Sequence, residues 1–285
     1  MLRLLLLYLS TVSTVSVAWG AASPPLPTMY MTIDPTGRLA NQLFEIASTT
    51  AIATQANAIF CYQPSEWTLF LDAVRLTKTL LTCPPNTGFV LVRESGFAVY
   101  DTNLLLPPRF NTRLTMNLQS YKYFDNYTLP FELKRKEWAA QWVRERNILA
   151  AVHVRRTDYT TWMDHYGGTP ENSYYEQAIQ LVTRKKNISA SQFVVCSDDT
   201  EWVKQQPVFA GMAVFSDSPG TDLAVISACP YVVVSIGTYG WWGAYLASKE
   251  FGRDAFVVAH HSTAHQFSLS SFNPQDYYPP SWHWV

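Results

Sequence analysis

Residues 149–159 read Leu-Ala-Ala-Val-His-Val-Arg-Arg-Thr-Asp-Tyr, an apolar run that ends abruptly in charged residues. A short apolar run with a polar end is typical of a buried strand. We therefore predict a strand over residues 149–154, and alternation along it places His153 and Arg155 on one side of a sheet. The same kind of segment, a short apolar run with a polar end, recurs in the second half of the chain.

Strands and helices alternate regularly from this point on. The predicted strands cover residues 149–154, 193–196, 212–215 and 231–235, with 256–258 as the strand that closes the sheet. The predicted helices cover residues 173–183 with Ser173 as the cap, 200–205, 222–229 and 239–247. Alternation with short connections favours a parallel, doubly wound sheet, so the fold class is α/β.

The first half opens in the same way. A strand at Tyr30–Ile33, a turn at 34–37, a helix at 39–57 and a strand at 58–62 start a second α/β layer. Further on, we predict a strand at 89–93 and a helix at 131–147, with a domain boundary near residues 130–148. The expected organisation is a signal anchor or signal peptide at 1–22, a short linker at 23–28, an acceptor-side α/β domain at 29–140 and a Rossmann-like domain at 141–285.

The first chemical motif is the polar end of the strand at 149–154. In open parallel sheets, ligands bind beyond the carboxyl ends of the strands. Arg155 can fork onto a diphosphate through paired N–H groups, and Asp158 can orient an arginine or accept from a ligand hydroxyl. Ser197 and Asp198 end the next strand in the same manner. An Arg–Asp pair that only pins the loop is the structural alternative.

The second motif, residues 234–246, is a buried strand followed by glycines, a hydroxyl residue and a helix start. Free backbone N–H groups and the positive end of the helix dipole bind phosphate well. Thr238 is expected to cap this helix, and Trp241 and Trp242 to fill the core. The third motif, residues 37–44, places Gly37, Arg38 and Asn41 at another helix start, where donors can meet a ligand.

Composition excludes one class of partner and leaves another open. The net charge of −1 argues against nucleic acid, which basic proteins recognise. Ten Trp and sixteen Tyr residues fit core packing or aromatic platforms for sugar rings. Composition does not separate these two uses.

The amino terminus indicates delivery to a secretory lumen. Residues 2–22 are apolar enough to anchor the chain in a membrane, and the small-x-small end at 18–20 also fits cleavage as a signal peptide. Asn126 and Asn187 begin glycosylation sequons that fit this compartment. The four cysteines allow three full pairings, and for two of them buried free thiols are an equal alternative: these are Cys196 and Cys229.

Together, the three motifs resemble the α-1,2-fucosyltransferases, that is, the galactoside 2-alpha-L-fucosyltransferases of glycosyltransferase family 11. The family's HxRRxD pattern is matched by residues 153–158, its G-x-x-x-N-Q-x-F by residues 37–44, and its I-G-T-[FY]-G with tryptophans by residues 236–242. Residues 118–124 and 194–199 also look like family segments in the right order. Ala40 departs from the glycine that many members carry there.

The resemblance implies two facing Rossmann-like domains of GT-B type, with the donor site in the C-terminal domain. It implies an inverting transfer of L-fucose from GDP-fucose to the 2-hydroxyl of a terminal galactose on a glycan, without an obligatory metal or other cofactor. Arg155 is the implied catalytic residue, and Gly37, Arg38 and Asn41 lie on the acceptor or fucose side. The implied donor-binding residues are His153, Arg156, Asp158, Ser197, Asp198, Asp222, Ser235, Thr238, Tyr239 and Gly240.

Several alternatives stay open at this level. Asp222 can simply cap its helix, and the residues that fit a general base by type are Asp34, Glu45, Glu66 and Asp164. The rival functions are a fucosyltransferase with another acceptor, such as a protein hydroxyl, and a non-catalytic nucleotide-sugar or glycan-binding protein. The expected location is the Golgi membrane with a lumenal catalytic domain, or secretion after cleavage of the leader.

Overall fold

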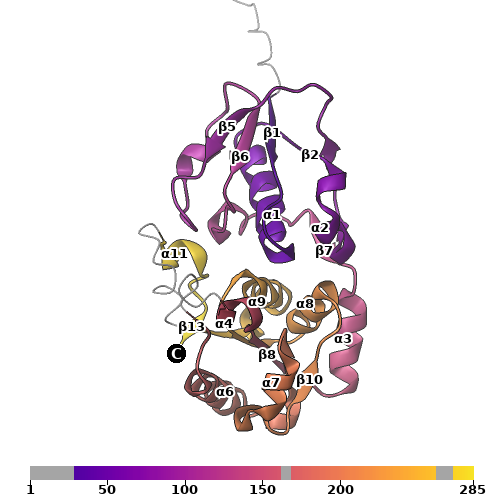
Figure 1. The fold of residues 1–285 in the computed structure, drawn as a ribbon, viewed down its shortest axis with the longest axis vertical. Coiled ribbons are helices and arrows are strands. Elements are labelled where there is room, and N and C mark those ends of the chain that lie inside the picture. Colours follow the sequence, from indigo (N-terminus) through magenta and orange to yellow (C-terminus); the bar gives the residue numbers. More distant parts are fainter. Residues whose placement is uncertain (1–28, 162–167, 261–271) are drawn as a thin grey trace, which may run out of the picture.

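The computed structural model describes residues 29–161, 168–260 and 272–285 (Figure 1). The expected leader and linker lie outside the described residues, as does Asp164. Within the described residues, no helix is both long and apolar enough to cross a bilayer.

Each half of the chain is built on its own parallel sheet. The first sheet has the order β4-β2-β1-β6-β5, and the second has the order β10-β9-β8-β11-β12-β13. Every pairing in both sheets is parallel, and a separate antiparallel pair joins β3 to β7. The fold is therefore α/β with parallel sheets, as predicted.

The first half matches the sequence prediction closely around its central helix. Its elements are β1 (Tyr30–Ile33), α1 (Leu39–Gln55), β2 (Ile59–Tyr62), α2 (Thr68–Ala73), β3 (Val74–Leu76), β4 (Leu81–Thr82), β5 (Val90–Arg93), β6 (Thr112–Thr115) and β7 (Phe131–Leu133). A disulfide joins Cys61 of β2 to Cys83, which follows β4. Of the cysteine arrangements that the sequence leaves open, the structure therefore has one disulfide, and Cys196 and Cys229 are buried free thiols.

The second half contains the predicted alternation. Its elements are α3 (Lys136–Glu145), β8 (Ala150–Val154), α4 (Thr157–Thr161), α6 (Asn172–Lys186), β9 (Phe193–Ser197), α7 (Thr200–Gln205), β10 (Ala213–Phe215), α8 (Pro219–Ser227), β11 (Tyr231–Val234), α9 (Thr238–Phe251), β12 (Phe256–Ala259), α11 (Pro274–Tyr277) and β13 (His283–Trp284). Central strands such as β8 are buried at every residue because helices cover both faces of the sheet.

Alternate residues of these strands belong to two different cores. Ala151 and Val232 pack with α8 and α9, whereas Val152 and Val233 pack with α6 and the segment after α7. The first core continues into the other half through α1, which packs against α9 (Figure 1). The two sheets therefore share one hydrophobic core at their junction.

Three local predictions outside the cavity were wrong. The helix expected at 131–147 begins only at Lys136, because Phe131 and Leu133 alternate inward as strand β7 and pair with β3. Ser173 does not cap α6: the helix starts at Asn172 and the residue before it makes no side-chain cap bond. The strand at 256–259 does not close its sheet, because β13 pairs along its outer side.

Candidate functional site

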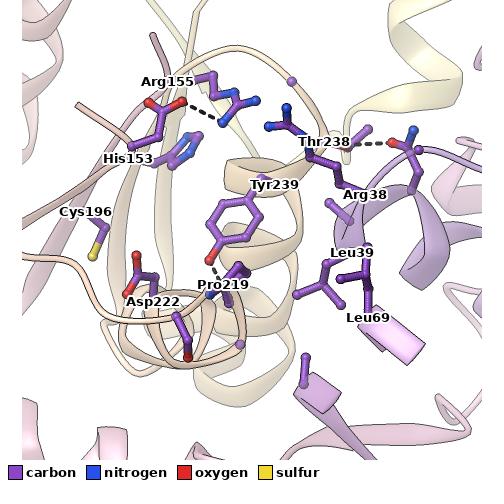
Figure 2. A pocket seen from close by; sticks show the side chains of 18 of the residues that line it. Arg38, Leu39, Leu69, His153, Arg155, Cys196, Pro219, Asp222, Thr238 and Tyr239 are labelled. Carbon is purple, nitrogen blue, oxygen red and sulfur yellow. Dashed lines mark hydrogen bonds and ion pairs between the residues drawn. The ribbon is translucent and has the colours of Figure 1, made fainter. Parts of the chain in front are cut away.

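A cavity of about 1490 Å³ lies where the two halves meet. Its walls come from the carboxyl ends of β8 and β9, the starts of α8 and α9, and the start of α1 (Figure 2). In Figure 2, Asp222 and Cys196 lie on the side of the six-stranded sheet, and Leu39 and Leu69 lie on the opposite side. The predicted motifs therefore meet in one place.

His153 lies near the end of β8 and is 4% exposed. Burial lowers the pKa of its imidazole to about 4, so the ring is neutral at physiological pH. Its Nδ1 has no hydrogen-bond partner in the described part of the chain. A Cβ on Gly240 would lie 2.3 Å from that nitrogen, so the absence of a side chain at Gly240 makes room for the ring.

Arg155 also lines the cavity, on the same side of β8 as His153, as alternation predicts. Its guanidinium forms ion pairs of 2.6 Å with Asp158 and of 2.6 Å with Asp198. Its backbone N–H donates to the hydroxyl of Ser235 at 3.3 Å. The side chain is thereby fixed in orientation at the edge of the cavity, where a planar fork of N–H groups can bind phosphate oxygens.

Three of the predicted donor-side residues support the site without lining the cavity. Arg156 pairs with Asp199 at 3.2 Å and lies over the ring of Trp202. Ser235 is buried beneath Arg155, and Gly240 lies behind His153. The remaining predicted donor-side residues line the cavity: His153, Asp158, Ser197, Asp198, Asp222, Thr238 and Tyr239.

The start of α9 differs from the expected cap. Thr238 does not cap the helix; the preceding residue is Gly237 with φ of 82°, and no side chain accepts from the first turn. The Thr238 hydroxyl instead donates to Asn41 Oδ1 of α1 at 3.0 Å (Figure 2). The first N–H groups of α9 are thus without a side-chain cap, and such groups bind anions well.

Asp222 lies in the first turn of α8, whose cap is Ser218, so it does not cap the helix. Its Oδ1 accepts from the backbone N–H of Asp217 at 2.7 Å. Burial is the main cause that raises the pKa of Asp222 to about 6, and the charge of Asp217 adds to it. A carboxyl at this position can accept from N–H or O–H groups of a ligand.

The first half contributes Gly37, Arg38 and Asn41 to the opposite wall. Gly37 has φ of 62°, and a Cβ there would lie 2.3 Å from the Asn41 amide nitrogen. Arg38 is largely exposed, and its guanidinium lies 3.8 Å from Asp158 across the cavity. These contacts bring the two halves of the site together.

Sequence reasoning missed part of this wall. Phe97, Asn117 and Gln119 also line the cavity. Gln119 belongs to the segment 118–124 that the sequence singled out, but no local pattern marks Phe97 or Asn117. Phe97 follows β5 and Asn117 follows β6, and both reach the cavity because β5, β6 and β1 are neighbours in the sheet.

The residues considered as general bases differ in environment. Asp34 pairs with Arg113 at 3.2 Å, and Glu66 lies in a short helical turn before α2. Glu45 is buried in α1 beneath the loop of Thr36. None of these three lines the cavity. The sequons at Asn126 and Asn187 are exposed.

Comparisons with known proteins place this chain in a family. The family model described as glycosyl transferase family 11 matches residues 137–285. Galactoside alpha-(1,2)-fucosyltransferase 2 of Sus scrofa is 26% identical over 92% of this chain and 81% of its own length. The enzyme of the same name from Bos taurus is 27% identical over 91% of this chain and 79% of its own.

A solved structure of another protein has a similar fold. A crystal structure of POFUT1 in complex with GDP has a TM-score of 0.50 and 11% sequence identity, and the match covers 82% of this chain and 99% of that one. At this identity the likeness concerns the fold alone. The family match itself covers more than half of the residues, including the cavity residues from His153 to Tyr239, and this chain therefore belongs to glycosyl transferase family 11.

Proposed function

We propose that this chain is an inverting galactoside α-1,2-fucosyltransferase, which moves L-fucose from GDP-fucose to the 2-hydroxyl of a terminal galactose on a glycan. The observation that carries the proposal is the position of Arg155 and the start of α9 opposite Arg38 and Asn41 in one cavity. The names of the family relatives from Sus scrofa and Bos taurus support the same reaction.

The proposed arrangement is that of a GT-B enzyme. Residues 29–140 form the acceptor-side domain and residues 141–285 form the GDP-fucose-binding domain, with the donor at the carboxyl ends of β8, β9 and β11. The all-parallel second sheet, covered on both faces, supports this assignment. The junction at the start of α3 lies within the expected boundary region.

In the proposed reaction, the acceptor oxygen forms a bond to C1 of fucose while the bond from C1 to the phosphate oxygen breaks. GDP leaves with the bonding electrons, and the proton of the acceptor hydroxyl passes to the departing phosphate oxygen, directly or through water. Arg155 and the uncapped N–H groups of α9 stabilise the charge that develops on the diphosphate. The neutral His153 and the carboxyl of Asp222 contact the nucleotide or the fucose.

We propose that the reaction needs no metal, because Arg155 and the helix start supply positive charge to the diphosphate. We also propose a Golgi membrane location with a lumenal catalytic domain, or secretion after cleavage of the leader. The exposed sequons at Asn126 and Asn187 and the Cys61–Cys83 disulfide support a secretory compartment.

The first test is GDP release from GDP-fucose by the purified protein in EDTA, with and without a terminal β-galactoside. We expect release that depends on the galactoside, and Arg155→Ala should lower it by about 10²–10³-fold, as loss of a transition-state donor does. Arg184→Ala, an exposed arginine of α6, serves as the matched control and should leave the rate unchanged.

The rival functions give different results. Tight GDP binding without any release would indicate a non-catalytic binding protein. Release with a folded protein domain or another glycan, but not with β-galactosides, would indicate a different acceptor. Release that EDTA abolishes would overturn the metal-free proposal alone.

A further inference from the structure

The carboxyl edge of the five-stranded sheet faces the same cavity as Arg155, and part of it has no role in the proposed donor binding. Strands β1 and β6 are neighbours in that sheet, and the loops that follow them both line the cavity. Asn117 and Gln119 come from the loop after β6. Because ligands bind beyond the carboxyl ends of parallel strands, this loop is a candidate for a second binding subsite.

This loop has an unfavourable backbone conformation. Met116 and Leu118, which flank Asn117, have φ of 91° and 48°. Such a conformation is unfavourable for a residue with a side chain and persists only where its surroundings impose it. Here Ser48 Oγ donates to the Leu118 carbonyl at 2.8 Å, and the Leu118 N–H donates to Glu94 at 3.2 Å. These bonds fix the loop in place.

Gln119 has an unpartnered oxygen at the cavity wall. Its side chain is 2% exposed, and its Nε2 donates to Asn41 Oδ1 at 3.2 Å. Its Oε1 has no partner within the described residues. A buried acceptor without a donor is unfavourable, and a hydroxyl of a bound sugar would supply the missing donor.

Asn117 is oriented by a chain of hydrogen bonds that ends at a buried carboxyl. The Thr36 hydroxyl contacts both Glu45 Oε1 and Asn117 Oδ1, the latter at 2.8 Å. The Thr36 N–H also donates to Glu45, at 3.1 Å to each oxygen. A threonine hydroxyl has a single proton, so it can donate to Glu45 or to Asn117 but not to both.

The protonation state of Glu45 decides between these two arrangements. If Glu45 is neutral, its own proton goes to the Thr36 oxygen and Thr36 donates to Asn117 Oδ1. The Asn117 amide nitrogen then remains available to a ligand, and it has no other partner in the described part of the chain. If Glu45 is ionised, Thr36 donates to Glu45, and the Asn117 amide must turn its nitrogen toward Thr36.

The surroundings of Glu45 favour the neutral form. Glu45 is fully buried in α1, and this burial is the main cause that raises its pKa to about 8. The bonds from Thr36 act in the opposite direction, and the charge of Asp34 adds to the rise. The other charged groups on neighbouring strands are Arg113 of β6, paired with Asp34, and Glu94 after β5.

We propose that Asn117 Nδ2 and Gln119 Oε1 form a donor–acceptor pair that binds two neighbouring hydroxyls of the acceptor hexose, with Glu45 acting through Thr36 as the positioning residue for Asn117. One sugar hydroxyl accepts from Asn117, and the next donates to Gln119. The attacking hydroxyl stays free to face the donor. This inference rests on the proposed transferase function and deepens it at the acceptor side.

The test compares a β-galactoside with its 3-deoxy and 4-deoxy analogues. For the wild type, each missing hydroxyl should lower kcat/KM roughly tenfold, as loss of one buried hydrogen bond does. Gln119→Leu should be insensitive to one of the two deletions, and Asn117→Ala to the other, because the partner atom is already absent.

Controls keep the outcome interpretable. Asn86→Ala changes an exposed asparagine that lies outside the cavity, and it should behave as wild type. Gln119→Met is a second, unbranched substitution in case Gln119→Leu does not fold. Equal penalties for both deoxy sugars in the wild type and in the variants would overturn the subsite and leave the transferase function intact.

The role of Glu45 has its own readout. The acceptor KM of the wild type should rise several-fold as pH increases through about 8, because Asn117 then no longer presents its N–H groups. Glu45→Gln, whose amide donates to Thr36 at every pH, should keep the low KM and remove this pH dependence. A wild-type KM that does not change with pH would overturn the positioning role. Absence of any transfer by the wild type would instead overturn the proposed function, and the subsite with it.

Discussion

Arg155 enters the cavity already bound to the carboxylates of Asp158 and Asp198. These two ion pairs hold the guanidinium in one orientation before any ligand arrives, so little side-chain entropy remains to be lost on binding. Arg38 approaches Asp158 from the other wall, which gives the same carboxylate a partner from each half. At the residue scale, the site is therefore organised around acidic residues as much as around Arg155.

Buried carboxyls beneath the loop after β6 make stability depend on pH. Burial raises the pKa of Glu94 from 4.5 to about 8, against bonds from the Leu118 N–H and the Tyr123 hydroxyl that lower it. The folded state therefore binds more protons than the unfolded state between these values. The contribution of protonated Glu94 to the stability of the folded state is fully present below pH 4.5 and is lost as pH rises through about 8.

We predict that the free energy of unfolding falls between pH 5 and pH 8.5, and that Glu94→Gln reduces this fall. One pH unit of displacement corresponds to about 1.4 kcal/mol, so the difference is large enough to measure by urea denaturation at several pH values. Glu201→Gln, an exposed carboxyl of α7, is the control and should reproduce the wild-type curve. Parallel curves for the wild type and Glu94→Gln would contradict the prediction.

At the scale of single elements, the start of α9 contributes three features to the cavity. It leaves its first N–H groups without a side-chain cap, sends Thr238 to α1, and places Gly240 against the imidazole of His153. A helix start can serve as an anion site only if no side chain occupies the space in front of it and the neighbouring strand comes close. Gly237 and Gly240 provide both conditions.

We predict that Gly240→Ala weakens GDP binding by at least tenfold. Its Cβ would lie 2.3 Å from His153 Nδ1 and 2.8 Å from Cγ, so the imidazole must move out of its place at the cavity. Titration calorimetry with GDP measures the effect. Gly88→Ala, where an added Cβ meets nothing within 4 Å, should bind GDP like the wild type. Unchanged affinity in Gly240→Ala would show that the position of His153 does not matter for the nucleotide.

At the scale of the whole molecule, the carboxyl terminus connects the two sheets. Strand β13 extends the second sheet beside β12, while α11 lies against the first half (Figure 1). Asp276 of α11 accepts from the Tyr100 N–H at 3.0 Å and pairs with Lys122 at 2.7 Å. Aromatic side chains in the core also connect the two halves. Phe44 of α1 packs against Trp241 of α9, with 4.5 Å between the ring centroids.

We predict that Asp276→Ala lowers the free energy of unfolding by about 2–3 kcal/mol, because it leaves the Tyr100 N–H and Lys122 without their acceptor. The unfolding transition should stay single, since both halves share one core. Glu250→Ala removes a half-exposed ion pair with Lys136 and should cost less than 1 kcal/mol. Two separate transitions in Asp276→Ala would instead indicate that α11 alone couples the halves.

The central elements of both sheets could be predicted from the sequence. Strand β1 matches its prediction at both ends, and α7 does so as well. Predictions failed where a distant partner decides the local structure. Phe131 and Leu133 form a strand because β3 lies beside them, and Thr238 turns toward Asn41 instead of capping its own helix.

The sequence by itself determined the parallel α/β character, the strand ends that carry His153 and Arg155, and the resemblance to the fucosyltransferases. Each of these depends on residues two to four positions apart, whose relation the strand and helix repeats set. Only the tertiary structure decided that Asn117 and Gln119 face the cavity and that Glu45 lies beneath Thr36. These positions depend on the order of strands in the sheet and on the packing of α1 against α9. Both bring together residues that are far apart along the chain.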